Sequence, residues 1–210
     1  CSVFSWKKRT KYHVFLGKNG HNTILFKRKN GQNLCNCMID RCLDGLIKNH
    51  YENSRNALLL SGARQVGKSY AIRKYGKANY SCFVEINFIE QPEAIRIFQN
   101  ATSSSDLLLR LSTFVQQTLV KGETLIFFDE VQAYPDVLTW IKFLVDSAEY
   151  KYALSGSLLG VQLNDIRSIP VGYLSEMEVF PLSFEEFVRA VGVGDITINS
   201  FREPWNNHTP

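Results

Sequence analysis

The stretch Gly62-Ala63-Arg64-Gln65-Val66-Gly67-Lys68-Ser69 decides the fold of this chain. It fits the pattern G-x-x-x-x-G-K-[ST], and it lies between an apolar, strand-like run, Ala57–Leu60, and a helix-compatible segment, Lys68–Tyr75. Gly62 and Gly67 let the backbone turn so that successive N–H groups point at one place, and the helix adds its positive N-terminal end. The stretch therefore predicts a phosphate-binding loop between a strand and a helix.

The residues of this loop predict individual contacts with a bound nucleotide. We expect the nucleotide-binding set to be the loop and the residue that follows it: Gly62, Ala63, Arg64, Gln65, Val66, Gly67, Lys68, Ser69 and Tyr70. Lys68 would reach the β- and γ-phosphates and take part in catalysis, and the Ser69 hydroxyl would be a ligand of Mg²⁺.

A second motif, Leu125-Ile126-Phe127-Phe128-Asp129-Glu130, consists of four apolar residues followed by two acids, which is a Walker B pattern. Asp129 would hold Mg²⁺ through its water shell, and Glu130 would orient and deprotonate an attacking water. Because ligands of open α/β sheets bind at the carboxyl ends of the strands, both motifs are expected at the same edge. The simpler alternative is a strand that ends in two solvated acids.

A third motif follows a short strand, at Ser155-Gly156-Ser157. A small polar side chain here would sense the γ-phosphate by a hydrogen bond to it or to the attacking water, and either Ser155 or Ser157 fits this catalytic role. The alternative is a Ser/Gly turn that closes a strand.

From residue 38 onward, strand-like runs alternate with helical patterns, which predicts an α/β fold with a mostly parallel sheet between two helical layers. The expected strands are Ala57–Ser61, Cys82–Phe88, Thr124–Asp129, Tyr152–Leu154 and Glu178–Phe180. Amphipathic helices are expected over Asp106–Val120 and Asp136–Ala148, and a further one opens at Met38, with Ile39, Leu43, Leu46 and Ile47 on one face.

Composition narrows the class of protein. The chain has 210 residues, of which 45% are hydrophobic, enough to bury one sizeable core and to argue against intrinsic disorder. No apolar run has the length of a membrane-spanning helix. Five Cys without a secretory signal favour a reducing, cytoplasmic setting.

Residues 1–37 differ from the rest, because they contain eight Lys or Arg and neither Asp nor Glu. Three interpretations stay open: non-native or upstream sequence before a natural start at Met38, a disordered basic tail, or an arm that binds nucleic acid. We expect an ATPase domain over residues 38–192, and a polar, disordered tail over 193–210.

These motifs resemble the AAA-type ATPases of bacteria and archaea whose ATPase domain precedes a C-terminal region of unknown function. The similar segments are GARQVGKS at 62–69, VEINF at 84–88, FFDEVQAYPDVLTWIKFLVD at 127–146, LSGSLLG at 154–160 and VFPLSFEEF at 179–187. The resemblance implies an additional-strand P-loop sandwich, in which the strand that ends near Ser155 lies between the P-loop strand and the strand of Asp129. It also implies that the nucleotide is ATP.

Relative to this family, the C-terminal region is replaced by the short stretch Gly194–Pro210. An arginine that contacts the γ-phosphate is therefore not identified, and Arg64 and Arg167 are the local candidates. The segment PLSFEEF (181–187), with apolar residues around Glu185 and Glu186, is a candidate docking site for a protein partner or for a missing C-terminal domain. The alternative is ordinary packing of a terminal helix on the sheet. A neighbouring subunit is a further candidate source of the arginine.

The leading functional hypothesis is a Mg²⁺-dependent ATP hydrolase that couples nucleotide state to conformational change. The alternatives are a nucleotide-gated interaction or DNA-binding module and, with less support, a P-loop small-molecule kinase. A zinc site at Cys35, Cys37, Cys42 and His50 has poor spacing, and the three N-x-[ST] sequons, without a secretion signal, are expected to be chance matches.

Overall fold

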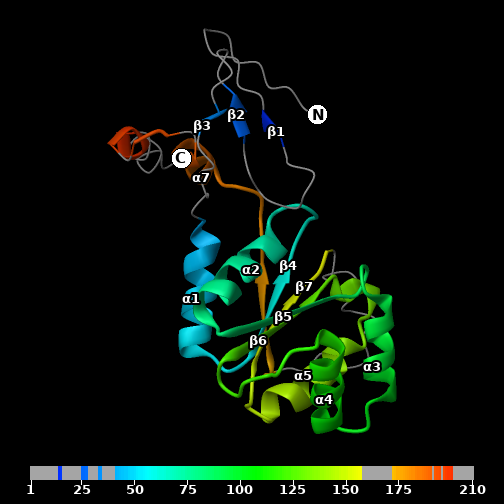
Figure 1. Cartoon of the computed structure of the whole chain (residues 1–210). Helices are drawn as coiled ribbons and strands as arrows, with labels where there is room; N and C mark the ends of the chain where they lie inside the picture. Colours follow the sequence, from blue (N-terminus) through cyan, green and yellow to red (C-terminus); the bar gives the residue numbers. More distant parts are fainter. Residues whose placement is uncertain are drawn as a thin grey trace. The chain divides into compact units, whose positions relative to one another are not determined.

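The computed structural model describes residues 14–15, 25–27, 33–34, 41–157, 172–190, 192–194 and 196–200 (Figure 1). The chain divides into two compact units. One unit is Leu43–Pro181, and the other combines Cys1–Cys42 with Leu182–Pro210.

The first unit is built on a five-stranded sheet in which every strand is parallel to its neighbours. The strands are β4 (Ala57–Ser61), β5 (Cys82–Asn87), β6 (Thr124–Asp129), β7 (Lys151–Ser155) and β8 (Leu174–Glu178). Their order is β5-β6-β7-β4-β8. This order confirms the α/β class and places β7 between the strand before the loop and the strand of Asp129, as the family resemblance implies.

Helices cover both faces of this sheet (Figure 1). The helical elements are α1 (Cys42–Asn53), α2 (Lys68–Asn79), η1 (Pro92–Ala94), α3 (Ile95–Asn100), α4 (Ser104–Val115), η2 (Val131–Ala133) and α5 (Val137–Asp146). Leu58 and Leu60 of β4 face a core shared with α1 and α2, whereas Leu59 faces the core shared with α3, α4 and α5. Because side chains alternate along a strand, one buried strand supplies both cores.

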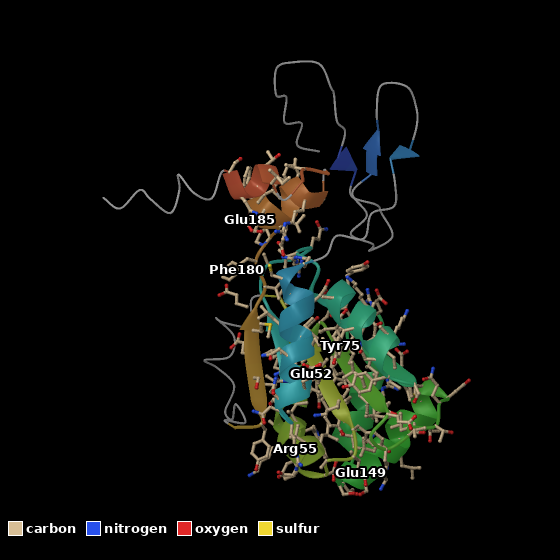
Figure 2. The ribbon with its side chains drawn as sticks, turned by 90° about the vertical axis from the view of Figure 1, so that its left-hand side faces the viewer. Glu52, Arg55, Tyr75, Glu149, Phe180 and Glu185 are labelled. Atoms are coloured by element: carbon tan, nitrogen blue, oxygen red, sulfur yellow. The ribbon has the colours of Figure 1, made fainter. Side chains whose placement is uncertain are left out.

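Aromatic rings join α1 to α2 on the first of these faces. Tyr75, labelled in Figure 2, stacks on Tyr51 with ring centroids 5.2 Å apart. Lys74 and Asp44 add an ion pair of 2.7 Å between the same helices. Arg55 and Glu149 precede β4 and β7, and they lie at the bottom of the view in Figure 2, at the amino-terminal edge of the sheet.

Sequence analysis was wrong about the last strand, which is Leu174–Glu178 rather than Glu178–Phe180. This strand pairs with β4 from Ala57↔Leu174 to Ser61↔Glu178, so it ends where β4 ends. It is an edge strand of the described sheet and its side chains are not fully buried, which explains why a search for continuous apolar runs missed it. Phe180 lies beyond it and is 63% exposed.

The helix expected over Asp106–Val120 begins earlier and ends earlier than predicted, at Ser104 and Val115. The Ser103 hydroxyl caps its start by accepting from the Asp106 N–H at 3.1 Å. Its end is fixed by Gln116, which adopts the left-handed conformation with φ 53°. The apolar residues that follow therefore belong to a loop.

Two further helix expectations need smaller corrections. The helix expected over Asp136–Ala148 is α5 (Val137–Asp146), and the Asp136 side chain makes no capping hydrogen bond. On α1, Leu43 and Ile47 are buried, but Leu46, which was expected on the same face, is 51% exposed. Ile39 lies outside the described residues.

The second unit contains three short antiparallel strands, β1 (Val14–Phe15), β2 (Leu25–Lys27) and β3 (Asn33–Leu34), in the order β1-β2-β3. It also contains α7 (Phe184–Ala190) and a helical stretch at 196–200. Sequence analysis expected neither these strands nor the helical stretch.

A capping box begins α7. The Ser183 N–H donates to Glu186 Oε2 at 2.9 Å, and the Glu186 N–H donates to Ser183 Oγ at 3.1 Å. Glu186 Oε1 also accepts from the Cys42 N–H at 3.0 Å. Burial is the largest single influence on the pKa of Glu186 and raises it, but these backbone hydrogen bonds and the nearby Arg41 together outweigh burial and hold the pKa below its usual range. Among the described residues, no helix is long and apolar enough to cross a membrane.

Candidate nucleotide site

The loop that joins β4 to α2 has the backbone that sequence analysis expected of a phosphate-binding loop. Gly62 has φ +134°, Gln65 has φ +63° and Gly67 has φ +95°. A Cβ at Gly62 would lie against the backbone carbonyl oxygen of Val179 at less than any non-bonded contact distance. Glycine at this position therefore serves two needs, an uncommon φ and the close approach of the chain that follows β8.

Lys68 is the first residue of α2, and its side chain folds back over the loop. Its Nζ donates to the carbonyl oxygens of Gly62 at 2.9 Å and of Ala63 at 2.7 Å. Burial lowers the pKa of Lys68, and the carboxylates of Glu130 and Asp129 partly oppose that shift. An ammonium group held by carbonyl oxygens inside this loop is placed to exchange them for phosphate oxygens.

Asp129 ends β6 and is only 2% exposed. Its Oδ1 accepts from Ser69 Oγ at 2.9 Å, from the Glu130 N–H at 3.1 Å and also from Ser155 Oγ. The loop, the acidic strand end and the turn after β7 thus meet on one carboxylate oxygen. Mg²⁺ prefers oxygen ligands, and a hydroxyl 2.9 Å from a carboxylate supplies two such oxygens that one cation can reach. The donor set at Ser69 and Asp129 fits this ion.

The other carboxylate oxygen of Asp129 faces residues that sequence analysis missed. Its Oδ2 lies 3.5 Å from Asn87 Nδ2 and 3.5 Å from Arg73 Nη2. Arg73 in turn holds Glu85, with Nε 2.8 Å and Nη2 2.5 Å from Oε1. The hydrogen bonds to Glu85 are the main reason that the pKa of Arg73 is raised, while burial opposes the shift.

A signal for these residues exists in the sequence. Asn87 ends β5 as Asp129 ends β6, and the two residues are opposite each other in the parallel register. Arg73 lies one helical turn after Ser69, on the same side of α2. Two sequence features therefore indicate these residues. One is a polar residue at the end of the strand next to that of Asp129, and the other is a polar residue one helical turn after the loop serine.

Glu130 follows Asp129 with a left-handed backbone, at φ 56°. Its Oε2 accepts a hydrogen bond from Gln132 Nε2, and Gln132 Oε1 accepts from the Ser157 N–H at 3.1 Å. The turn expected to carry a sensor is therefore adjacent to both acids: Ser155 Oγ contacts Asp129, and the Ser157 backbone connects to Glu130 through Gln132.

The remaining predicted residues are spread around this site. Arg64 is exposed on the loop, and Val66 and Tyr70 are half-buried. Arg167 lies outside the described residues, as do Cys35 and Cys37. Over the described part of the chain no three His, Cys, Asp or Glu side chains group together as a metal site.

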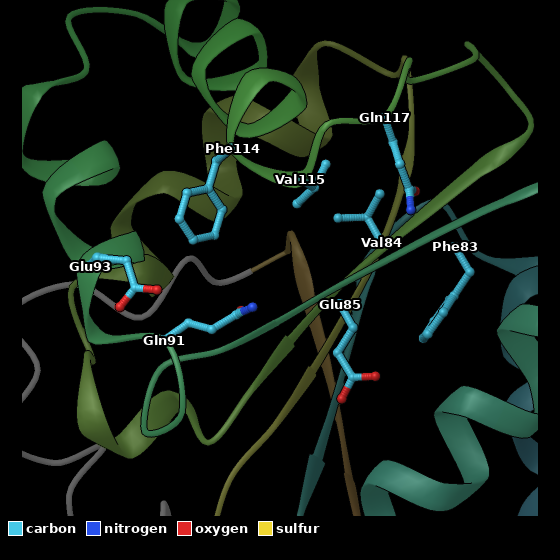
Figure 3. Close-up of a pocket in the computed structure, with 8 residues that line it drawn as sticks. All are labelled: Phe83, Val84, Glu85, Gln91, Glu93, Phe114, Val115 and Gln117. Atoms are coloured by element: carbon cyan, nitrogen blue, oxygen red, sulfur yellow. The ribbon is translucent and has the colours of Figure 1, made fainter.

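A pocket of about 430 Å³ lies along β5, and none of its lining residues belongs to the phosphate-binding loop (Figure 3). Its lining residues come from β5, from the end of α4 and from the segment around η1: Phe83, Val84, Glu85, Gln91, Glu93, Phe114, Val115 and Gln117. Figure 3 shows Phe114 and Val115 above the strand and Glu85 below it. Glu85 connects this pocket to the site through its ion pair with Arg73.

The sheet order, the loop and the paired acids define a P-loop ATPase-type domain. A sequence profile of the AAA domain family matches residues 54–188. The chain belongs to this family. No curated protein matches the chain.

Two solved structures are similar in part. PCH-2 of C. elegans shares 11% sequence identity, with a TM-score of 0.41 over 67% of this chain and 39% of that one. The Pif1 helicase from Bacteroides, solved in complex with ADP-AlF3 and ssDNA, shares 14%, with a TM-score of 0.44 over 70% of this chain and 43% of that one. The chain thus spans less than half the length of either protein.

Proposed function

We propose that this chain binds Mg-ATP and hydrolyses it to ADP and phosphate, with Glu130 as the general base. The observation that carries the proposal is the 2.9 Å hydrogen bond between Ser69 Oγ of the loop and Asp129 Oδ1 of the acidic strand end. This contact joins the phosphate-binding element to the acid that precedes Glu130. Two motifs that are 60 residues apart in sequence form one site.

Each residue of the site has a defined task in this reaction. The loop N–H groups and Lys68 would bind the phosphates, and Ser69 and Asp129 would hold Mg²⁺, which would neutralise charge on the phosphate oxygens. Glu130 accepts a proton from water, whose oxygen then bonds to the γ-phosphorus. The bond between that phosphorus and the bridging oxygen breaks, and its electron pair stays with ADP.

The position of the 155–157 turn supports the proposed coupling of nucleotide state to conformation. This turn contacts Asp129 through Ser155 and reaches Glu130 through Gln132, a route by which a change at the γ-phosphate would reach the end of β7. The nucleic-acid arm stays a prediction, because residues 1–37 lie mostly outside the described part of the chain.

Phosphate release by Glu130→Gln and by the unmodified chain tests the proposal. The substitution keeps the size of the side chain and removes the base, so kcat is expected to fall by roughly 10²- to 10⁴-fold. ATP affinity, measured with a fluorescent analogue, is expected to stay within about threefold, because the loop is unchanged.

Equal turnover by both proteins would contradict the assignment of Glu130. Absence of turnover in the unmodified chain, with ATP still bound, would favour the nucleotide-gated module. A phosphorylated nucleoside or sugar in a substrate screen would favour the kinase.

A further inference from the structure

We propose that Gln132 is a positioning residue, which fixes the carboxylate of Glu130 and ties it to the turn at 155–157. The inference rests on the proposed hydrolysis and adds a regulatory link to it. The link is a bridge of two hydrogen bonds made by one side-chain amide, with Glu130 at one end and the Ser157 backbone at the other.

The local backbone creates this bridge. Glu130 adopts φ 56°, ψ 45°, and the 3-10 turn η2 begins immediately after it. The Ala133 N–H closes the turn on the Glu130 carbonyl oxygen at 2.9 Å. A left-handed residue followed by a tight turn brings the side chain of residue 132 back to the side chain of residue 130. In an extended chain these two side chains would lie on the same face without this closure.

The chemistry of the two ends explains why an amide is needed. Gln132 Nε2 donates to the Glu130 carboxylate, whereas Gln132 Oε1 accepts from the Ser157 N–H at 3.1 Å. Only a side chain with a donor and an acceptor on one carbon makes both bonds. A leucine or methionine of similar size makes neither, and a glutamate keeps the acceptor but places a second carboxylate beside Glu130.

The bridge ends on a part of the turn that is in contact with the metal-binding acid. Ser155, two residues before Ser157, donates to Asp129 Oδ1 and is 1% exposed. Any movement of the 155–157 turn when nucleotide is exchanged therefore changes the position of Gln132 and, with it, the aim of the Glu130 carboxylate. Through Gln132, the orientation of the Glu130 carboxylate depends on the conformation of the 155–157 turn.

The test compares Gln132→Met with Gln99→Met, an exposed glutamine of α3 outside the site. Gln132→Met is expected to lower kcat about tenfold, since a misdirected catalytic group loses rate steeply with small displacements. KM, the affinity for a fluorescent ATP analogue and the melting temperature are expected to stay close to those of the Gln99→Met control. Gln132→Glu is expected to lose at least as much kcat as Gln132→Met, because it replaces the donor by a negative charge.

A double variant separates positioning from a general structural effect. In a Glu130→Gln background, Gln132→Met is expected to cause no further loss of the residual turnover, because the group it positions is already absent. An equal tenfold loss in both backgrounds, or a kcat of Gln132→Met equal to that of the control, would overturn the inference. If Glu130→Gln hydrolyses ATP as fast as the unmodified chain, the proposed function fails instead, so the two failures are distinguishable.

Discussion

Asp129 shows how one buried carboxylate organises the site. At 2% exposure, an ionised acid costs several kcal/mol unless it is paired and hydrogen-bonded. Ser69 and Ser155 supply hydrogen bonds to one oxygen, and Arg73 supplies a charge 3.5 Å from the other. Sequence analysis predicted Asp129 and Ser69 as site residues, whereas Arg73 is brought close to Asp129 by the packing of α2 on the sheet.

At the same scale, Gly62→Ala is expected to destabilise the fold by about 3 kcal/mol. The added methyl group meets the Val179 backbone, and φ +134° is unfavourable for alanine, each effect costing roughly 1–3 kcal/mol. Gly122→Ala is the control, because Gly122 has φ +78° but open space around it, so the conformational cost of roughly 1 kcal/mol acts alone. Urea unfolding measures the loss of stability in both variants. An equal loss in Gly62→Ala and Gly122→Ala would show that the contact with Val179 adds little to the cost.

The ends of helices and strands in the first unit are set either by single residues or by pairing with a neighbouring strand. Ser103 and Gln116 set the two ends of α4, whereas β8 is defined by its register with β4. The residues that end α4 are visible in the sequence, but the helix was predicted from hydrophobic periodicity alone, which does not locate its ends. The register is not a local property.

Gly45 lowers the stability of helix α1, because glycine is a poor helix former. This glycine lies inside the helix, is exposed, and has nothing within 4 Å of an added Cβ. Gly45→Ala is expected to raise the free energy of unfolding by about 0.5–1 kcal/mol, because alanine loses less backbone entropy in a helix.

Lys48→Ala is the matched control for this prediction. Lys48 is exposed on the same helix, its ion pair with Glu52 at 3.8 Å is weak, and lysine and alanine differ little in helix propensity. In this variant the free energy of unfolding, measured with a denaturant, is expected to change by less than about 0.5 kcal/mol. A gain as large as that of Gly45→Ala would show that the effect is not specific to glycine.

At the scale of the whole molecule, stability is expected to depend on pH through His50. This residue is 9% exposed, its Nε2 lies 3.0 Å from the Asn56 carbonyl oxygen, and burial lowers its pKa below 6.5. The Asn56 hydrogen bond opposes that shift, and the positive charge of Lys151 adds to it. Between the pKa of folded His50 and about 6.5, this side chain therefore binds less proton in the folded state than in the unfolded chain.

Because the depressed pKa disfavours the protonated form in the fold, the free energy of unfolding is expected to decrease as the pH falls from about 6.5 toward the pKa of folded His50. Above that range His50 makes no pH-dependent contribution. Urea titrations between pH 8 and pH 5, on the unmodified chain and on His50→Gln, measure the difference in slope. Parallel curves for the two proteins would contradict the assignment to His50.

The sequence by itself determined the α/β class, the phosphate-binding loop, and the acids at the end of β6. Those features are local: a loop of fixed spacing between a strand and a helix, or an apolar run that ends in Asp129 and Glu130. Their meeting at one edge followed from the general rule for parallel strands. Strands β4 and β6 were predicted with their observed bounds.

Only the tertiary structure decided which side chains surround the two acids. Asn87 reaches Asp129 because β5 pairs with β6 in register, and Arg73 reaches it because α2 packs on that face. Gln132 joins Glu130 to Ser157 because β7 lies next to β6. Such contacts depend on strand order, register and helix packing, which are set by long-range pairing and leave no fixed spacing in the sequence.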